Sequence, residues 1–152
     1  MVSLGLLVLR AVVGGIFAVH GYAKVFGGPG KGEAVSPEAE RLLGKGFAEQ
    51  MEQGGIQNVA GFQQSLGLPY PKLGAIAVSA AELGGGLALI LGWRTRLAAL
   101  SLLFAQGVAV KKVHAPHGLL GEGGFELSSI LMAATAGLAL AGPGALALDA
   151  LD

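Results

Sequence analysis

The feature that most constrains this chain is its first apolar stretch, which runs from Val2 to Val25. An α-helix rises about 1.5 Å per residue, so about twenty apolar residues cross a bilayer core about 30 Å thick. This stretch is therefore long enough to span a membrane. Composition agrees, because 53% of the 152 residues are hydrophobic and 13% are charged, whereas about a quarter of an average soluble domain is charged.

Three basic residues, Arg10, His20 and Lys24, interrupt this stretch. An ionisable side chain in hydrocarbon costs at least a few kcal/mol unless a partner or trapped water faces it. At about 100° per residue, the three side chains lie on the same third of the helix as Gly14 and Gly21. We therefore expect a buried stripe, in which the glycines allow close helix approach and the basic groups meet polar partners.

Apolar stretches over residues 71–93, 97–113 and 125–141 predict three further spans. The turn after the second span, residues 92–96, is short, so the second and third spans should be antiparallel neighbours. We predict an all-α fold in one domain of 152 residues: a transmembrane four-helix bundle with up-down-up-down topology.

Residues 27–70 form an insertion between the first and second spans. Ser36-Pro37-Glu38 is typical of a helix start and predicts a polar helix to about Gln53, which is solvated or lies on the membrane surface. A second short helix, with Phe62 and Tyr70 near headgroup level, either lies at the interface or packs on the end of the bundle. The sequence assigns no role to residues 28–55.

The later spans carry few polar groups. Glu82 is the one charge of the second span, and it shares a helix face with Ala75, Ser79 and Gly86 that should pack on another helix. In the third span the buried polar residue is Gln106. The fourth span has an acid in its first turn and a face of small residues, Ser129, Ala133 and Gly137.

In the predicted topology, polar residues from all four spans converge near one end of the bundle. Those near the end are His20, Lys24, His114, His117 and Glu126, with Glu82 about midway down. Opposite charges in a low-dielectric site stabilise each other, so Glu82 should pair with Lys24 or Arg10, and Glu126 with a histidine. Such pairs either form a functional pocket or act as structural clamps.

Several classes of function are disfavoured. Ten basic and ten acidic residues cancel, so no net field attracts nucleic acid. The chain has no cysteine, which removes disulfides and thiolate sites. We expect no metal and no haem, because no pair of ligands with metal-binding spacing shares one helix face.

Short motifs along the chain resemble the DoxX family of small four-helix membrane proteins, in the family's order and over nearly the whole length. They are Leu9-Arg10, Gly14, Phe17, His20-Gly21-Tyr22-Ala23-Lys24, Leu66-Gly67-Leu68-Pro69, Ala81-Glu82-Leu83-Gly84-Gly85, Leu91-Gly92, Thr95-Arg96-Leu97-Ala98-Ala99, Gly124-Phe125-Glu126, Gly142-Pro143-Gly144 and Leu148-Asp149.

This resemblance implies a multi-pass protein of the cytoplasmic membrane of a bacterium or archaeon. It is similar to subunits of thiosulfate:quinone oxidoreductases and to proteins of oxidative-stress defence and sulfur metabolism. By motif, the resemblance carries over five site candidates: Arg10, His20, Lys24, Glu82 and Glu126.

Three functions are compatible with these observations. The first is a redox-associated subunit, which would be an oxidoreductase of the thiosulfate:quinone type if it is an enzyme. A quinone would enter from the end of the bundle that carries His20, His114 and His117, here called the histidine end, and His20 or Glu82 would move a proton. Its substrate-binding candidates are Arg10, Lys24, Gln106, His114 and Glu126. The second is a non-enzymatic binder or carrier of a small molecule. The third is an assembly partner, in a protein complex or a homo-oligomer, whose charge pairs only clamp helices.

The distribution of basic residues predicts the orientation. The first and third loops hold seven, at positions 24, 31, 41, 45, 72, 111 and 112, against Arg94 and Arg96 on the other side. By the positive-inside rule, the histidine end faces the cytoplasm and both termini face outward.

Overall fold

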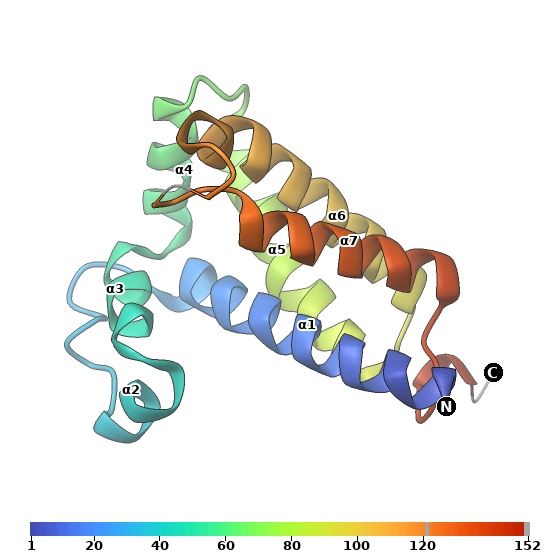
Figure 1. Ribbon diagram of the computed structural model, residues 1–152. Coiled ribbons are helices and arrows are strands. Elements are labelled where there is room, and N and C mark those ends of the chain that lie inside the picture. The colour runs from blue at the N-terminus through green and yellow to red at the C-terminus, as the bar shows by residue number, and fades with distance from the viewer. Residues whose placement is uncertain (121, 151–152) are drawn as a thin grey trace. The chain divides into compact units, whose positions relative to one another are not determined.

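The computed structural model describes residues 1–120 and 122–150, and every regular element in that part of the chain is helical (Figure 1). Its α-helices are α1 Val2–Phe26, α2 Pro37–Leu43, α3 Lys45–Gln53, α4 Ile56–Ser65, α5 Pro71–Leu91, α6 Thr95–Ala109 and α7 Glu126–Ala141. A π-helical turn, Val110–His114, and a 3₁₀ turn, Ala115–His117, continue α6, and another 3₁₀ turn, Leu148–Ala150, follows α7.

Three helical stretches are long and apolar enough to cross a membrane: α1, α5 and the stretch Thr95–His117 that begins with α6. The predicted fourth span forms α7, an apolar helix of 16 residues, which is only about 24 Å long. The all-α class is confirmed, and each predicted span is helical with ends within a few residues of those expected. The up-down-up-down arrangement of the complete chain stays a prediction.

The helices of the insertion differ from expectation at one point. The single polar helix predicted to extend to about Gln53 is wrong, because Gly44 has a φ of 87° and separates α2 from α3. This conformation strains any residue with a Cβ, so glycine allows the chain to turn there. The predicted start is correct, since the Ser36 hydroxyl accepts a hydrogen bond from the Ala39 amide at 3.2 Å.

The chain divides into two compact units. The first, the core unit, comprises Met1–Ala18 and the described residues of Gly84–Asp152. The second, the insertion unit, is Val19–Leu83. Since the boundaries fall within α1 and α5, these two helices each contribute to both units.

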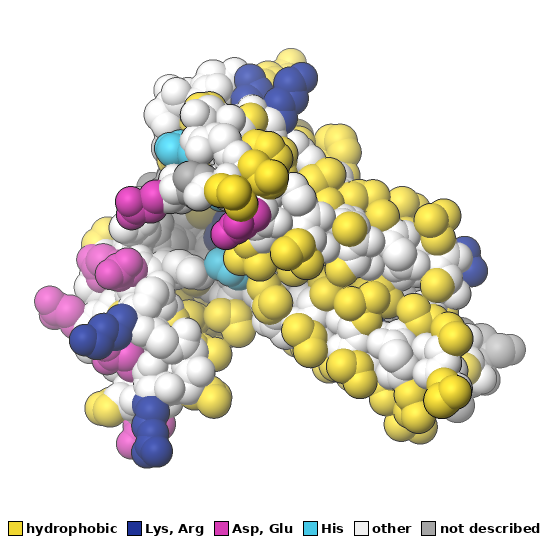
Figure 2. Space-filling model, in the orientation of Figure 1, with side chains coloured by type: hydrophobic (Ala, Val, Ile, Leu, Met, Phe, Trp, Pro, Cys, Tyr) yellow, Lys and Arg dark blue, Asp and Glu magenta, His cyan; other side chains and the backbone are white. Residues whose placement is uncertain are grey.

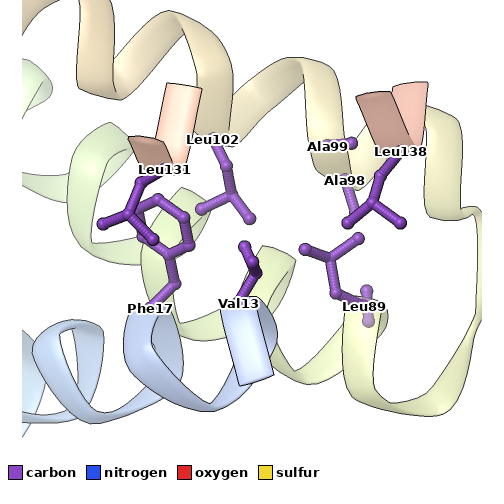
Figure 3. Packing of buried hydrophobic residues seen from close by; sticks show 9 residues of the cluster. Val13, Phe17, Leu89, Ala98, Ala99, Leu102, Leu131 and Leu138 are labelled. Atoms are coloured by element: carbon purple, nitrogen blue, oxygen red, sulfur yellow. The ribbon is translucent and has the colours of Figure 1, made fainter. Parts of the chain in front are cut away.

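The buried centre of the core unit is shared by α1, α5, α6 and α7 (Figure 3). Its members are Val13, Phe17, Ala88, Leu89, Ala98, Ala99, Leu102, Leu131 and Leu138. In addition, α6 packs directly on α7. Parts of four apolar helices therefore surround one core.

The buried face of α7 is not its small-residue face. Leu131, Thr135 and Leu138 are buried, whereas Ala133 is exposed and Gly137 is only half-buried. Leucine side chains thus fill the space between α7 and its neighbours, and the Thr135 hydroxyl is satisfied within its own helix by the Leu131 carbonyl at 2.9 Å.

Glycines bring the backbones of α1 and α5 into direct contact. In the core unit, a Cβ on Gly14 would lie 2.6 Å from the Gly86 carbonyl oxygen, and one on Gly86 would lie 2.6 Å from the Ala18 nitrogen. In the insertion unit, a Cβ on Gly21 would lie 2.2 Å from the Leu83 nitrogen. Such close approach is typical of helices that associate within a membrane.

Large apolar side chains cover much of the outer surface of the long helices (Figure 2). Examples with more than half of their surface exposed are Val8, Val12, Leu73, Ile76, Leu97, Leu100, Phe104, Ile130 and Leu140. Soluble proteins rarely expose apolar patches of this extent. Together with the three candidate spans, this surface identifies the chain as a membrane protein.

The contact at Gly21 gives a test of this packing. We expect Gly21→Ala to lower stability by about 1–3 kcal/mol, the usual cost of overpacking, because the added methyl group meets the α5 backbone. The matched control is Gly15→Ala in the same helix, where a Cβ has no neighbour within 4 Å. Thermal unfolding in detergent, followed by circular dichroism, should show a loss for Gly21→Ala alone. Equal midpoints for both variants would contradict the contact.

Candidate functional site

An ion pair in the insertion unit joins α1 to α5. The Lys24 ammonium group, in the last turns of α1, contacts the Glu82 carboxylate near the middle of α5. The two side chains meet because the helix backbones touch at Gly21, one turn before Lys24 and directly opposite Glu82 and Leu83. Of the two cations that the sequence offers to Glu82, Lys24 is thus its partner.

Both charges are shielded from solvent. The Glu82 side chain is 10% exposed and the Lys24 side chain 28%. In such surroundings, removal of one partner is expected to cost about 3–5 kcal/mol, because the other charge stays buried without compensation. The predicted face of α5 is also confirmed, since Ala75 and Ser79 are buried together with Glu82.

Two further polar side chains belong to the same stretches of helix. Ser79 precedes Glu82 by three residues, which places the two on one face with Cβ atoms about 5–6 Å apart. Its side chain is 1% exposed, and its hydroxyl has no hydrogen-bond partner among the described residues. His20 lies one turn before Lys24 on α1 and is half-buried.

The insertion is fastened to the end of α1 next to Lys24. The Ala23 carbonyl accepts hydrogen bonds from the amides of Gly27 at 2.8 Å and Gly55 at 3.1 Å. Phe47 and Met51, one turn apart on α3, pack against the Ala23 side chain. These contacts fix the turn of α1 that carries the ammonium group.

A carboxylate closes the glycine-rich segment that follows α1. Glu52 accepts hydrogen bonds from the amides of Gly30 at 2.9 Å and Gly32 at 3.0 Å. The hydrogen bond from Gly30, which has the larger effect, and the one from Gly32 lower the pKa of the exposed Glu52 carboxyl. The segment from Gly28 to Gly32 therefore has a defined shape although it contains no helix.

Arg10, the other buried cation of α1, has a different role in the core unit. Its side chain is fully buried and donates to four backbone carbonyls: Leu89 at 3.2 Å, Ile90 at 3.0 Å, Ala145 at 2.8 Å and Leu146 at 2.5 Å. The first two are carbonyls in the last turn of α5, a position that cations commonly cap, and the Leu89 carbonyl also accepts a hydrogen bond from the Gly92 amide at 3.1 Å. Arg10 thus binds α5 to the C-terminal segment.

Asp149 is an important residue that the sequence reasoning did not select. Its carboxylate accepts hydrogen bonds from the amides of Arg94 at 2.5 Å and Thr95 at 2.8 Å. It therefore caps the start of α6 from a distance, since Arg94 at the N-cap supplies no side-chain cap. The sequence did contain one signal: the first turn of α6 has no acidic residue of its own, so its free amides need an acceptor from elsewhere in the chain.

The electrostatics of Asp149 follow from these contacts. Burial raises the pKa of its carboxyl, but the amide hydrogen bonds of Thr95 and Arg94 and the charge of Arg10 outweigh burial and hold it below the ordinary value of 3.8. The ionised form is therefore the one that stabilises the fold.

The other predicted site residues also lie in the core unit. The Nδ1 atom of His114 is 2.8 Å from the Gly123 carbonyl oxygen, and that of His117 is 3.1 Å from the Val113 carbonyl oxygen. A carbonyl only accepts, so both Nδ1 atoms carry the hydrogen. Gln106 is half-buried and Glu126 exposed.

Within the part of the chain that the structure describes, Glu126 forms no ion pair with His114 or His117. Of the histidines with which Glu126 was predicted to pair, His114 and His117 are therefore not its partners, and a pairing with His20 stays a prediction. In that same part, no three side chains among His, Asp and Glu gather closely enough to hold a metal ion.

Comparison with known proteins agrees with the geometry of the helices. The sequence model of the DoxX family matches residues 5–115, from the first turn of α1 to the end of the π-helical turn after α6. The chain belongs to the DoxX family. Neither the curated proteins nor the solved structures contained a match. The matched range includes Arg10, Lys24 and Glu82 and stops before Glu126.

The cap on α6 gives this DoxX-family protein a specific response to acid. Folding lowers the pKa of Asp149, so its carboxylate stabilises the folded state fully above about pH 3.8. This stabilisation is lost as the pH falls through the pKa that Asp149 has in the folded protein. Unfolding midpoints between about pH 6 and pH 3 should therefore fall further in the wild type than in Asp149→Asn. At neutral pH we expect Asp149→Ala to lose about 1 kcal/mol, as for other N-caps.

The control for this measurement is Glu49→Gln, which removes an exposed carboxylate from α3. It should retain the acid response of the wild type. If Asp149→Asn responds to acid as the wild type does, Asp149 does not supply the stabilisation.

Proposed function

We propose that this protein binds the headgroup of a quinone beside the Lys24–Glu82 pair and exchanges protons with it through Glu82 or His20. The observation that carries the proposal is a part-buried ion pair between two otherwise apolar membrane helices. Ionisable groups in such positions are costly and commonly mark a functional site.

Helix association alone does not require this pair. Gly14, Gly21 and Gly86 already bring the two backbones into contact. Apolar side chains of similar size usually replace a buried ion pair without loss of stability. The charges of Lys24 and Glu82 therefore need a reason beyond packing, and ligand binding supplies one.

The residues present fit a quinone headgroup, whose two carbonyl oxygens accept hydrogen bonds. Lys24 supplies an ammonium donor, and Ser79 supplies a buried hydroxyl with no partner among the described residues. In the insertion unit Gly21 lies opposite Leu83 and Lys24 contacts Glu82, and from this pairing of α1 with α5 we infer that Ser79, one turn before Glu82, lies level with Lys24. An unpaired buried hydroxyl is unfavourable, and a ligand oxygen would satisfy it.

When bound, a quinone accepts two electrons and two protons and is released as quinol. The proposed role of the chain is to orient the carbonyl oxygens and deliver the protons. His20 and Glu82 are the groups of the insertion unit suited to proton transfer. The electrons come from a separate donor, a sulfur compound such as thiosulfate in the reaction that the family resemblance implies.

Gln106, His114 and Glu126 stay candidate contacts to the quinone, whereas we assign Arg10 a structural role.

A structural clamp is the competing proposal, and one observation favours it. The Lys24–Glu82 contact directly joins α1 to α5, and such a link would stabilise the helix pair without any ligand. A binder or carrier without redox activity is a third proposal, for which Lys24, Glu82 and Ser79 would serve equally.

We further propose that the chain lies in the cytoplasmic membrane with its histidine end toward the cytoplasm. This orientation rests on the seven basic residues of the first and third loops. We also propose that the chain associates with a protein partner or with further copies of itself.

The binding proposal is tested by titrating the protein in lipid nanodiscs with a short-chain quinone, using calorimetry. We expect Lys24→Gln and Ser79→Ala each to weaken binding about tenfold or more, because a lost hydrogen bond to a charged or buried group is worth about 1.5–3 kcal/mol. Glu82→Gln should also weaken binding, because it removes the carboxylate that holds the Lys24 ammonium group in place. The exposed residues Glu49 and Lys72 provide matched controls, and their glutamine variants should bind as the wild type does.

The double variant Lys24→Gln/Glu82→Gln separates binding from clamping. It removes both charges and keeps two polar side chains that can hydrogen-bond, so its unfolding midpoint should recover relative to either single variant. Recovered stability with binding still lost supports the proposed site. Wild-type affinity in the double variant would instead establish the pair as a clamp, and binding without quinone reduction in the presence of a donor would indicate a carrier.

A further inference from the structure

Helix α2 in the insertion unit has an apolar face that the described chain covers only in part. The helix contains no buried residue. Leu42 is 83% exposed and Leu43 is 40% exposed, although they are adjacent in sequence. Its neighbour α3 differs, since Phe47 and Met51 are buried against α1.

The exposed leucines belong to an amphipathic pattern. At about 100° per residue, Ala39, Leu42 and Leu43 lie together on one side of α2, whereas Glu40 and Arg41 lie on the other. Glu38, one turn before Leu42, borders the apolar side. This arrangement is typical of short helices that lie in the plane of a membrane surface. The Ser36 cap and the Gly44 break fix the ends of the helix.

The connectivity places α2 near a membrane surface. The insertion begins where α1 ends, at Phe26, and ends where α5 begins, at Pro71. Both helices are long and apolar enough to cross a membrane. In the insertion unit, α2, α3 and α4 form a row that runs across the C-terminal end of α1 (Figure 1), and α3 is tied to that end through Ala23.

We propose that the Leu42–Leu43 face of α2 inserts into the interfacial layer of the same bilayer that α1 crosses. The occupant of this face is lipid, because chain continuity holds α2 beside a bilayer and its exposed side chains are apolar. The Leu42–Leu43 face then holds α2 to the lipid, while α3 holds the rest of the insertion to the end of α1. This inference does not depend on quinone binding.

The charges of the insertion indicate which lipid chemistry matters. Residues 31–53 contain three basic and five acidic side chains, so attraction to anionic headgroups does not drive the contact. The contact is driven by burial of the two leucine side chains among the glycerol and upper acyl groups of the lipid. A bilayer of zwitterionic phosphatidylcholine is therefore sufficient for α2 to bind.

The absence of cysteine allows a direct test. A single cysteine introduced as Leu42→Cys is the one labelling site for a thiol-reactive spin label, and Glu40→Cys on the opposite side of α2 is the matched control. Both full-length variants are reconstituted into phosphatidylcholine vesicles. Electron paramagnetic resonance then compares collisions of the label with oxygen, which concentrates in lipid, and with a water-soluble nickel chelate.

We expect oxygen to dominate at position 42 and the nickel chelate to dominate at position 40. The ratio at position 42 should not change when a third of the lipid is replaced by phosphatidylglycerol. Predominant nickel collisions at position 42 would show a solvated helix and overturn the proposal. Shielding of position 42 from both reagents would show that protein covers the face, which also overturns it.

Discussion

The structure depends on the need to neutralise charges that lie within apolar helices. Lys24 and Glu82 satisfy this need together, and they can do so only where the backbones of α1 and α5 come as close as Gly21 permits. A larger residue at that position would separate the helices and leave two costly charges without their contact. The Lys24–Glu82 ion pair therefore depends on the glycine at position 21.

Two cations of α1, the buried Arg10 and the part-buried Lys24, illustrate how surroundings decide the role of a residue. Arg10 donates only to backbone carbonyls, which do not titrate, and it thereby joins the end of α5 to the C-terminal segment. Lys24 faces a carboxylate, so its contact is between two groups that can change charge. For this reason we propose a structural role for Arg10 and a functional one for Lys24, although the sequence presents them alike.

Local patterns were sufficient for the helices but not for their contacts. Apolar length and helix-ending glycines predicted the long helices within a few residues, and the face of α5 that includes Ser79 and Glu82 is buried as expected. The break at Gly44 was missed, because a glycine in a polar segment is compatible with both a continuous helix and a turn. The cap supplied by Asp149 was missed because it acts on α6 from a distant part of the chain.

By itself, the sequence determined the class of protein, the helices and a short set of costly polar residues, since hydropathy and helical periodicity act over a few turns. Only the tertiary structure decided which of these residues meet. The choice of Lys24 over Arg10 for Glu82, and the solvent exposure of Glu126, depend on how closely separate backbones approach. That distance is set by side-chain volumes from several helices at once, and no single stretch of sequence contains it.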